Sequence, residues 1–290
     1  LGGAAFWVLT RPAALSPATL AALTAHPADP AAGERVFWAA GCAGCHAAPG
    51  LDAASPPEAR LVLSGGRRLA SDFGTFVVPN VSPHPEAGIG GWTLADFARA
   101  TLAGVSPGGA HYYPAFPYAT YVRMTPADLA DLWAFWQTLP ADATPSAPHE
   151  MGFPFTLRRG VGLWKWLHLD AAFVAPPAED PQRARGRYLV EALGHCAECH
   201  TPRDATGGLD RSRWLAGAPN PSGTGRIPAL PPQGWSAEDI SAYLFSGFTP
   251  AFDVVGGSMA DVVAHMARLP ASDRDAIAAY LLALRASPSR

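Results

Sequence analysis

Apolar residues recur at helical spacing near the end of each half of the chain. They are Leu129, Leu132, Trp133, Trp136 and Leu139 in the first half, and Ile277, Tyr280, Leu281 and Leu284 in the second. Each series follows a helix-start signal, Thr-Pro-Ala-Asp at 125–128 and Ser-Asp-Arg-Asp at 272–275. Spacings of three and four residues place these side chains on one helix face. The pattern predicts that two similar domains each end in a buried helix.

Two earlier pairs of helix starts also repeat between the halves. Asp-Pro at 29–30 and at 180–181 places a capping side chain before a proline at the first helical position. Trp-Thr-Leu-Ala-Asp at 92–96 and Trp-Ser-Ala-Glu-Asp at 235–239 have the form of a capping box. An internal repeat of three helices, with a loop before the last, predicts an all-α and loop-rich fold.

The repeat divides the chain into four segments. Residues 28–140 and 180–290 are expected to form the two tandem domains, and residues 1–27 an N-terminal extension or anchor remnant. Residues 141–179 are a Pro-rich connector whose aromatic runs, Phe-Pro-Phe and Leu-Trp-Lys-Trp-Leu, are too apolar for a free linker. We expect this connector to pack over the domain interface, or to dock a partner or a membrane.

The first ten residues form an apolar run with Trp7 near its end. Such a run is shorter than the roughly 20 residues that span a bilayer. It is compatible with the tail of a membrane anchor, the end of a signal sequence, or a packed N-terminal segment. Because tryptophan suits the membrane interface, we favour membrane association through the N-terminus.

Composition and charge exclude some functions. The length of 290 residues suggests two domains, and 29 glycines and 30 prolines without a repeating period indicate long ordered loops. The net charge is −3 and Lys165 is the sole lysine, so nothing indicates nucleic-acid binding.

All four cysteines lie in two copies of one pentad. The copies are Cys42-Ala43-Gly44-Cys45-His46 and Cys196-Ala197-Glu198-Cys199-His200. C-x-x-C-H is the attachment signature of c-type haem. The two cysteines form thioethers to one porphyrin, and the histidine that follows becomes the proximal iron ligand. The sequence therefore predicts two haem c groups, one in each of two cytochrome c domains, with His46 and His200 as iron ligands.

Two other sites could use such cysteine pairs. A four-thiolate zinc site is one, but structural zinc pairs usually lie closer together and do not require the histidines. A redox dithiol is the other, and it also needs no following histidine. Since both copies carry the histidine and no cysteine is left over, haem is favoured.

The sixth iron ligand separates electron carriers from enzymes, and methionine gives a closed, high-potential haem. Met124 and Met259 both lie before the last helix of a domain, and we expect them to ligate the first and second iron. Met266 is the rival for the second iron and His111 the fallback for the first. Met151, in the connector, is interpreted as packing.

Trp92 and Trp235 occupy matching positions in the two halves, and each is expected to pack on a porphyrin or in the core. Four arginines are candidate partners of the haem propionates, because a guanidinium matches a carboxylate in shape. They are Arg67, Arg68, Arg203 and Arg213.

The chain resembles the multihaem cytochrome c subunits of bacterial membrane-bound dehydrogenases for alcohols, gluconate and related polyols. The resemblance covers residues 29–284. It rests on the pentads, Asn80-Val81-Ser82-Pro83, Gly88-Ile89-Gly90-Gly91-Trp92, Tyr112 to Tyr121, and Gly256-Gly257-Ser258-Met259-Ala260. Many relatives have Pro-Ala-Met-Pro-Tyr where this chain has Phe116 in the middle position. Many also carry three haems, whereas this chain has two attachment motifs.

The resemblance implies electron transfer rather than catalysis by this chain. Such subunits take electrons from a catalytic dehydrogenase and pass them to quinone or a soluble cytochrome, and thioether attachment implies the bacterial periplasm, here at the inner membrane. A dihaem peroxidase-like enzyme is the main alternative, but it needs one open iron. A cysteine-ligated thiosulfate-oxidising cytochrome would need a fifth cysteine. A terminal reductase or sensor module is the third possibility.

Overall fold

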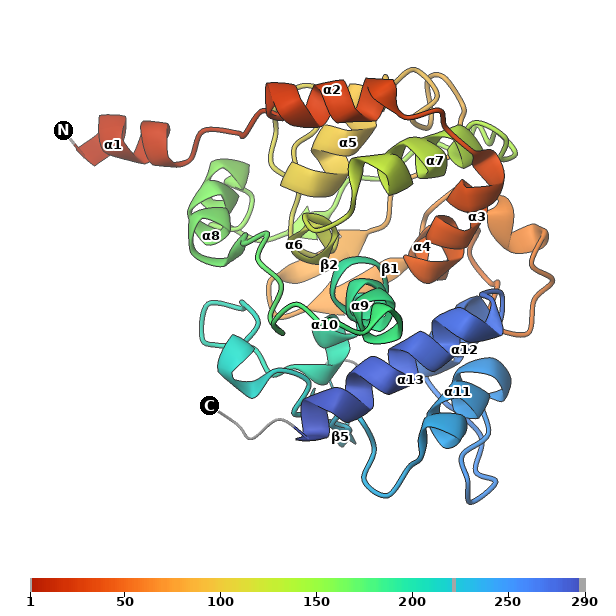
Figure 1. Ribbon diagram of the computed structural model, residues 1–290. Helices are drawn as coiled ribbons and strands as arrows, with labels where there is room; N and C mark the ends of the chain where they lie inside the picture. Colours follow the sequence, from red (N-terminus) through yellow and green to blue (C-terminus); the bar gives the residue numbers. More distant parts are fainter. Residues whose placement is uncertain (1, 221–222, 287–290) are drawn as a thin grey trace. The chain divides into compact units, whose positions relative to one another are not determined.

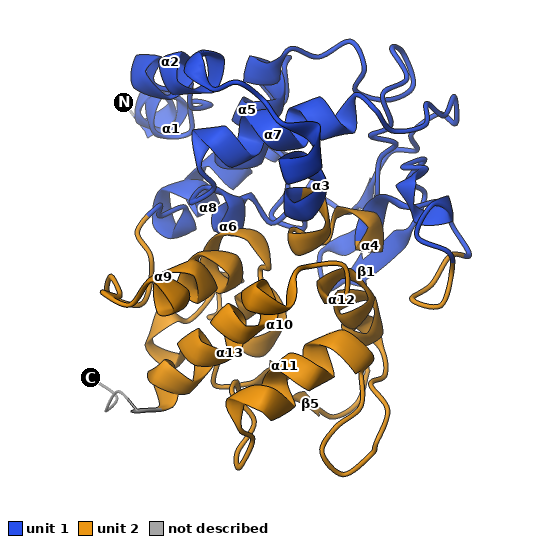
Figure 2. Cartoon of the chain, turned by 45° about the vertical axis from the view of Figure 1, so that its right-hand side comes forward, with its two compact units in different colours: residues 1–36, 45–50, 56–171 blue, residues 37–44, 51–55, 172–290 orange. Residues whose placement is uncertain are grey.

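The computed structural model describes residues 2–220 and 223–286, and the chain divides into two compact units (Figure 2). Unit 1 comprises Leu1–Val36, Cys45–Gly50 and Pro56–Ala171, and unit 2 comprises Phe37–Gly44, Leu51–Ser55 and Ala172–Arg290. Helices dominate both units, as predicted. The dividing line passes through the first pentad rather than beside it.

Unit 1 contains most of the N-terminal helices (Figure 1). They are α1 (Gly2–Leu9), α2 (Pro17–Ala25), the larger part of α3 (Pro30–Ala39), α5 (Leu94–Ala103), α6 (Tyr118–Tyr121), α7 (Pro126–Trp136) and α8 (Val161–His168), with the 3-10 turns η1 (Ala59–Leu61) and η2 (Arg158–Gly160). A small antiparallel sheet, which the sequence did not predict, has the strand order β1 (Arg68–Ser71), β2 (Gly74–Val77) and β3 (Glu150–Met151). Its register pairs Arg68 with Val77 and Gly74 with Met151.

Unit 2 repeats this organisation. Its elements are α9 (Pro181–Tyr188), the π-helical turn η3 (Leu189–Leu193), α10 (Ala197–His200), the 3-10 turn η4 (Arg211–Arg213), β4 (Ala218–Pro219), β5 (Arg226–Ile227), α11 (Ala237–Ser246), α12 (Ser258–Met266) and α13 (Ala271–Ala286). β4 and β5 form a two-stranded antiparallel ribbon. The described part of α13 packs against α9 and α11.

In each half of the chain, the helix before the pentad meets a later helix, α7 or α13, at a glycine. A Cβ atom at Gly33 of α3 would lie 2.0 Å from the carbonyl oxygen of Asp131 in α7. A Cβ atom at Gly186 of α9 would lie 1.8 Å from the carbonyl oxygen of Ala276 in α13. Only glycine allows this close backbone approach. The crossing fixes the helix that delivers each pentad against α7 in the first half and α13 in the second.

Most of the predicted helix starts are confirmed. α3 and α9 begin at Pro30 and Pro181, and Thr93 and Ser236 form complete capping boxes at the start of α5 and α11. Two differences concern the second half. α13 begins at Ala271, one residue before the predicted signal. Residues 258–266, expected to be loop, form helix α12.

The apolar N-terminal run forms α1, whose described side chains are exposed; its first residue, Leu1, lies outside the described residues. Within the described part of the chain, no helix is both long enough and apolar enough to cross a membrane.

The connector is ordered through α8, which packs on unit 1. Lys165, buried in the middle of α8, donates from Nζ to the carbonyl oxygens of Ala103 and Gly104, at 2.7 and 2.6 Å, and to Nδ1 of His111 at 3.1 Å. The same ammonium lies 4.5 Å from the ring centre of Tyr118. These contacts place a cation at the C-terminal end of α5, where the helix dipole favours positive charge.

The Lys165 ammonium makes stability depend on pH. Burial, and secondly the charge of Arg99, lower the pKa of Lys165 to about 7, whereas an unfolded lysine titrates near 10.4. Between pH 7 and 10 the unfolded chain therefore keeps a proton that the folded chain releases. The Lys165 contribution to the free energy of unfolding should rise with pH, by at most about 1.4 kcal/mol per pH unit. Urea unfolding of wild type and Lys165→Met from pH 6 to 10 measures the free energy of unfolding of each protein as a function of pH. If the two free energies change in parallel with pH, the Lys165 contribution is contradicted.

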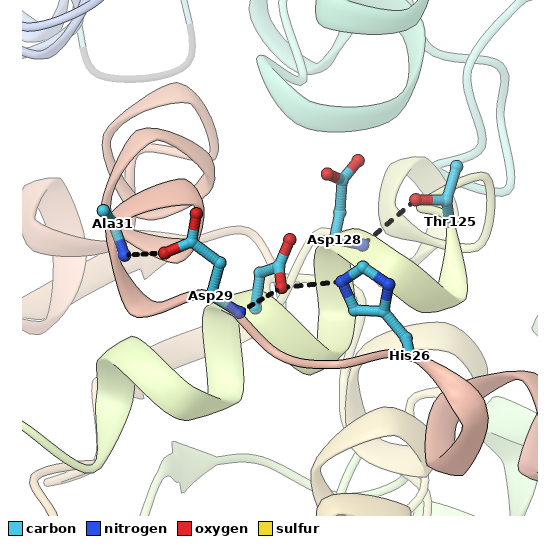
Figure 3. A network of polar contacts seen from close by, with 6 residues as sticks. His26, Asp29, Ala31, Thr125 and Asp128 are labelled. Atoms are coloured by element: carbon cyan, nitrogen blue, oxygen red, sulfur yellow. Dashed lines mark hydrogen bonds and ion pairs between the residues drawn. The ribbon is translucent and has the colours of Figure 1, made fainter.

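A buried carboxylate ties the N-terminal segment to α7 (Figure 3). Asp131 Oδ1 accepts hydrogen bonds from the backbone N–H of Asp29, at 2.7 Å, and from Nε2 of His26, at 2.8 Å. Asp29 in turn accepts from the N–H of Ala31. The start of α3, and so the path of the chain into the first pentad, is fixed by one side chain of the last helix.

Asp131→Ala should therefore lower the free energy of unfolding by about 1–3 kcal/mol, because the partly buried donors at residues 26 and 29 lose their acceptor. Chemical denaturation followed by circular dichroism measures the loss. Glu86→Ala, which removes an exposed carboxylate of the same unit, is the matched control and should stay within about 0.5 kcal/mol of wild type. Equal effects of the two substitutions would show that the network adds no stability.

Candidate functional site

The first pentad forms a single helical turn, α4 (Cys42–His46), directly after α3. Gly41, with φ of +67°, makes the tight turn between the two helices. Cys42 and Cys45 stand three residues apart on this turn, so their side chains project from one face. Cys42 is half-buried and Cys45 exposed.

The second pentad has the same local form. The turn η3 carries the chain from α9 to residue 194, and His195 precedes Cys196 with φ of +38°, at the position that Gly41 occupies in the first copy. The helix α10 then ends at His200. Buried Glu191 stabilises η3 by accepting hydrogen bonds from the backbone N–H of Ala175, at 3.1 Å, and from the hydroxyl of Tyr280.

Both motif histidines are oriented by a proline carbonyl. Nδ1 of His46 lies 3.0 Å from the carbonyl oxygen of Pro79, and Nδ1 of His200 lies 2.7 Å from that of Pro228. A carbonyl only accepts, so Nδ1 carries the proton and donates it. Burial lowers the pKa of both rings, which favours the neutral form. Each ring therefore has its Nε2 lone pair available for a metal.

The loops that follow the two pentads share one hydrogen-bonding pattern. The N–H of Gly65 donates to the carbonyl oxygen of His46, as that of Gly217 does to His200, at 2.9 and 2.7 Å. Further on, Val81 N–H donates to the carbonyl oxygen of Leu63 at 3.0 Å, and Leu230 N–H to that of Leu215 at 2.9 Å. The two halves thus build the same histidine support from different sequences.

Sequence comparison agrees with this geometry. The profile of the family described as Cytochrome c matches residues 30–140. The chain is 55% identical to the "Diheme cytochrome c-type" protein of Cereibacter sphaeroides, over 97% of this chain and 93% of that protein. The chain belongs to the dihaem cytochrome c family. Its two attachment motifs each carry a covalent haem c, and the predicted cofactors are confirmed.

More distant relatives are subunits of dehydrogenases. The chain is 34% identical to the cytochrome c subunit of the quinone alcohol dehydrogenase of Gluconobacter oxydans, over 97% of this chain and 61% of that protein. It is 33% identical to the gluconate 2-dehydrogenase cytochrome c subunit of Pantoea cypripedii, over 94% of this chain and 63% of that protein. The chain thus spans less than two thirds of these relatives, and it is related to electron-transfer subunits of quinone-linked dehydrogenases.

The residues present fit a haem in each copy. Each pentad offers two thiol sulfurs on one helical face and one imidazole whose Nε2 is free to ligate, which is the donor set that the group requires. Unit 2 also holds a buried donor that needs an acceptor: Nε of Arg187 has no hydrogen-bond partner in the part of the chain described. A haem propionate is an acceptor of the right charge for it.

The candidate methionine ligands lie between the middle and last helices of their halves. Met124 is buried directly before α7, and its N–H donates to the carbonyl oxygen of Tyr121 at 2.8 Å. Met259 is half-buried in the first turn of α12, and its rival Met266 is buried at the end of that helix. Met151 lies in β3. Ligation by Met124 and Met259 stays a prediction.

The backbone pattern aligns the two ligand segments. The N–H of Tyr112 donates to the carbonyl oxygen of Gly104, as that of Val255 does to Gly247, at 2.7 and 2.8 Å. Phe116 lies four residues after Tyr112, and Met259 lies four residues after Val255, so Phe116 occupies the position of Met259.

The counterpart of Met124 is found from the start of the last helix. Met124 lies two residues before the first residue of α7, and Leu269 lies two residues before the first residue of α13. The N–H of Leu269 donates to the carbonyl oxygen of Met266 at 3.1 Å. Met124 therefore occupies the position of a buried leucine in the other half. The two halves differ at both positions that matter for the sixth ligand.

The two tryptophans also occupy equivalent places. Trp92 and Trp235 each precede the N-cap of the middle helix, and both are half-buried. The ring of Trp235 packs edge-on against Tyr243, with centroids 5.2 Å apart. Contact of either tryptophan with a porphyrin stays a prediction.

Arg68, Arg203 and Arg213, which were proposed for the propionates, pair with carboxylates of the chain. Arg203 lies 2.6 Å from Glu198, inside the second pentad, and Arg213 lies 2.7 Å from Asp210. Arg68 forms an exposed pair with Glu150. These pairs favour a structural role for the three side chains.

The supporting carbonyls of Pro79 and Pro228 were not identified from the sequence. They lie 33 and 28 residues from their histidines, and a backbone acceptor leaves no side-chain signature. The repeated Pro after each glycine-rich loop was the one available signal.

Proposed function

We propose that this chain relays electrons in the bacterial periplasm, from a catalytic dehydrogenase subunit to quinone or to a soluble cytochrome. The observation that carries the proposal is the pair of pentads with carbonyl-supported histidines in a chain related to dehydrogenase cytochrome subunits. The haem supplies one-electron iron chemistry when bound. The protein holds it covalently and keeps the ligating nitrogen deprotonated.

In this proposal, His46 and Met124 ligate the first iron, and His200 and Met259 the second. A thioether and an imidazole together favour a high reduction potential and leave no open position for a substrate. The carbonyls of Pro79 and Pro228 would hold the two imidazoles in one orientation toward a bound haem. Trp92 and Trp235 then contribute apolar cover to the two porphyrins.

Association with the inner membrane is part of the same proposal, through the exposed apolar helix α1. The Gluconobacter oxydans relative is the cytochrome c subunit of a quinone-dependent alcohol dehydrogenase, and a quinone acceptor dissolved in the bilayer would require the electron donor's complex to lie at the membrane.

Purification from native membranes, followed by stopped-flow reduction, tests the proposal. The haem-loaded chain should co-purify with a flavin-, quinone- or molybdenum-containing dehydrogenase, and both haems should be reduced when that enzyme's substrate is added. The proposal would be overturned if the protein is purified without a partner and the dehydrogenase does not reduce its haems.

Phe116 gives a specific reason to test a second function. It stands where the other half has Met259, so an iron without a sulfur ligand in the first site would be open to peroxide. Turnover of hydrogen peroxide with a reduced donor cytochrome would establish peroxidase activity. Its absence, together with reduction by the dehydrogenase, supports the relay.

A further inference from the structure

We propose that α1 and α8 together form a membrane-binding surface that contacts anionic phospholipid. The surface is the α1–α8 patch, which consists of Trp7, Val8 and Leu9 of α1 and Leu163, Trp166 and Leu167 of α8. The proposal deepens the membrane association proposed above, because it assigns half of the contact to the connector between the haem motifs.

The patch is exposed and apolar. Trp7 and Trp166 expose 64% and 69% of their surface, and the other four side chains are also exposed. On α8, residues 163, 166 and 167 follow the helical spacing of three and four, so they form one stripe. α8 contacts the C-terminal end of α1 within unit 1, and the rest of α1 projects outward (Figure 1).

The two helices are held together by a chain of close contacts. A Cβ atom at Gly162 would lie 2.7 Å from the Cα of Thr10, so α8 meets the end of α1 at backbone distance. Arg159 donates from Nε to Thr10 Oγ1 at 2.8 Å, and its guanidinium lies 4.0 Å from the ring centre of Trp7. The patch is therefore a defined surface and not two independent segments.

Buried polar contacts fix the same surface to the first-haem half. Nε2 of His111 donates to the carbonyl oxygen of Thr10 at 2.9 Å, and Nδ1 of His111 accepts from Lys165. Lys165 in turn bonds the end of α5, as described above. Because these groups are buried, a membrane bound at the patch would orient unit 1.

Charge identifies a lipid surface as the occupant. Arg11 follows α1, and Arg158 and Arg159 precede α8, whereas Lys165 is buried and does not reach the surface. The acidic residues that flank this part of the connector are Glu150, which pairs with Arg68, and Asp170. The chain as a whole has a net charge of −3, so the patch lies in a locally basic region of an acidic protein. Two exposed tryptophans flanked by arginines match the interface of an anionic bilayer, where indole rings settle at headgroup depth.

Vesicle flotation of the haem-loaded 290-residue chain tests the surface. The protein should float with vesicles of phosphatidylcholine and phosphatidylglycerol, less with phosphatidylcholine alone, and less at high salt. Trp166→Ala with Leu167→Ala should lower the membrane partition coefficient about tenfold, since two apolar side chains no longer enter the interface. Phe252→Ala is the matched control, because Phe252 is 85% exposed in unit 2, and it should leave the coefficient unchanged.

A second measurement does not depend on the stability of the double variant. All four native cysteines lie in the haem pentads, so Trp166→Cys supplies one thiol for a nitroxide label. On vesicles the label should gain accessibility to oxygen and lose accessibility to a water-soluble nickel complex, whereas a label at Phe252→Cys should not change.

Two outcomes would overturn the contact of α8 with the membrane: the double variant floats as well as wild type, or the label at position 166 stays in water. Either outcome would leave α1 as the sole membrane contact of the proposal. The proposal would also be overturned if the protein floats with no vesicle and instead binds the dehydrogenase through this patch. The surface would then be assigned to a protein partner. Reduction of the haems by the dehydrogenase in detergent-free solution is measured separately, so the relay can stand if the membrane contact fails.

Discussion

A chain in which Cys196 and Cys199 are both replaced by serine should carry one haem instead of two. Serine cannot form the thioether, and an imidazole alone would hold the second porphyrin only by ligation and packing. The pyridine haemochrome absorbance per protein should therefore fall to about half of the wild-type value, since each pentad attaches one haem. Cys42→Ser with Cys45→Ser is the matched variant and should lose the other half.

The same substitution should unfold unit 2 more readily than unit 1. A group that binds only the folded protein stabilises the folded state, so unit 2 loses this contribution when the second porphyrin is absent. Proteolysis should cut the segment after residue 180 first, while the haem attached to the first pentad keeps its spectrum. A variant that still binds two haems covalently would contradict the assignment of the second pentad.

The attachment chemistry could be predicted from the sequence because it is local. Two cysteines and a histidine within five residues define the site without knowledge of the fold, and the capping residues Thr93 and Ser236 define helix starts in the same way. In each case, the interacting atoms belong to neighbouring residues. Local signals of this kind are the most reliable part of a sequence.

Long-range features could not be predicted in that way. The carbonyls that orient His46 and His200 depend on how a loop closes, and Asp131 reaches residues 26 and 29 across the chain. The small sheet in unit 1 arises where β3 meets a hairpin more than seventy residues earlier. Helix α12 was missed because the glycines before it signalled a loop.

The comparison between the halves adds a constraint that neither half gives alone. With Phe116 in the position of Met259, the first iron cannot receive the equivalent sulfur ligand. Met124 is the remaining methionine near the last helix of that half, and its counterpart is the core residue Leu269. The proposal therefore requires a residue in a core position to serve as the ligand.

Met124→Leu tests that requirement with little disturbance of packing. Leucine already occupies the equivalent buried position in unit 2, and methionine-to-leucine replacements in a core usually cost less than about 1.5 kcal/mol. If Met124 ligates the first iron, the variant should lose one of two equivalents of the near-infrared methionine-to-iron absorption of the ferric protein. The potential of one haem should fall by on the order of 0.1 V, because the axial ligand sets the potential.

Met259→Leu should remove the other equivalent, and the double variant should retain none. Met266→Leu is the control, since a buried methionine that only packs should leave both the absorption and the two potentials unchanged. If Met124→Leu retains both equivalents, Met124 is a core residue and the first iron takes its sulfur from another methionine. If the wild-type protein itself shows one equivalent, the first iron has no methionine ligand, and peroxide binding to the first haem becomes the decisive measurement, because Phe116 stands at the ligand position.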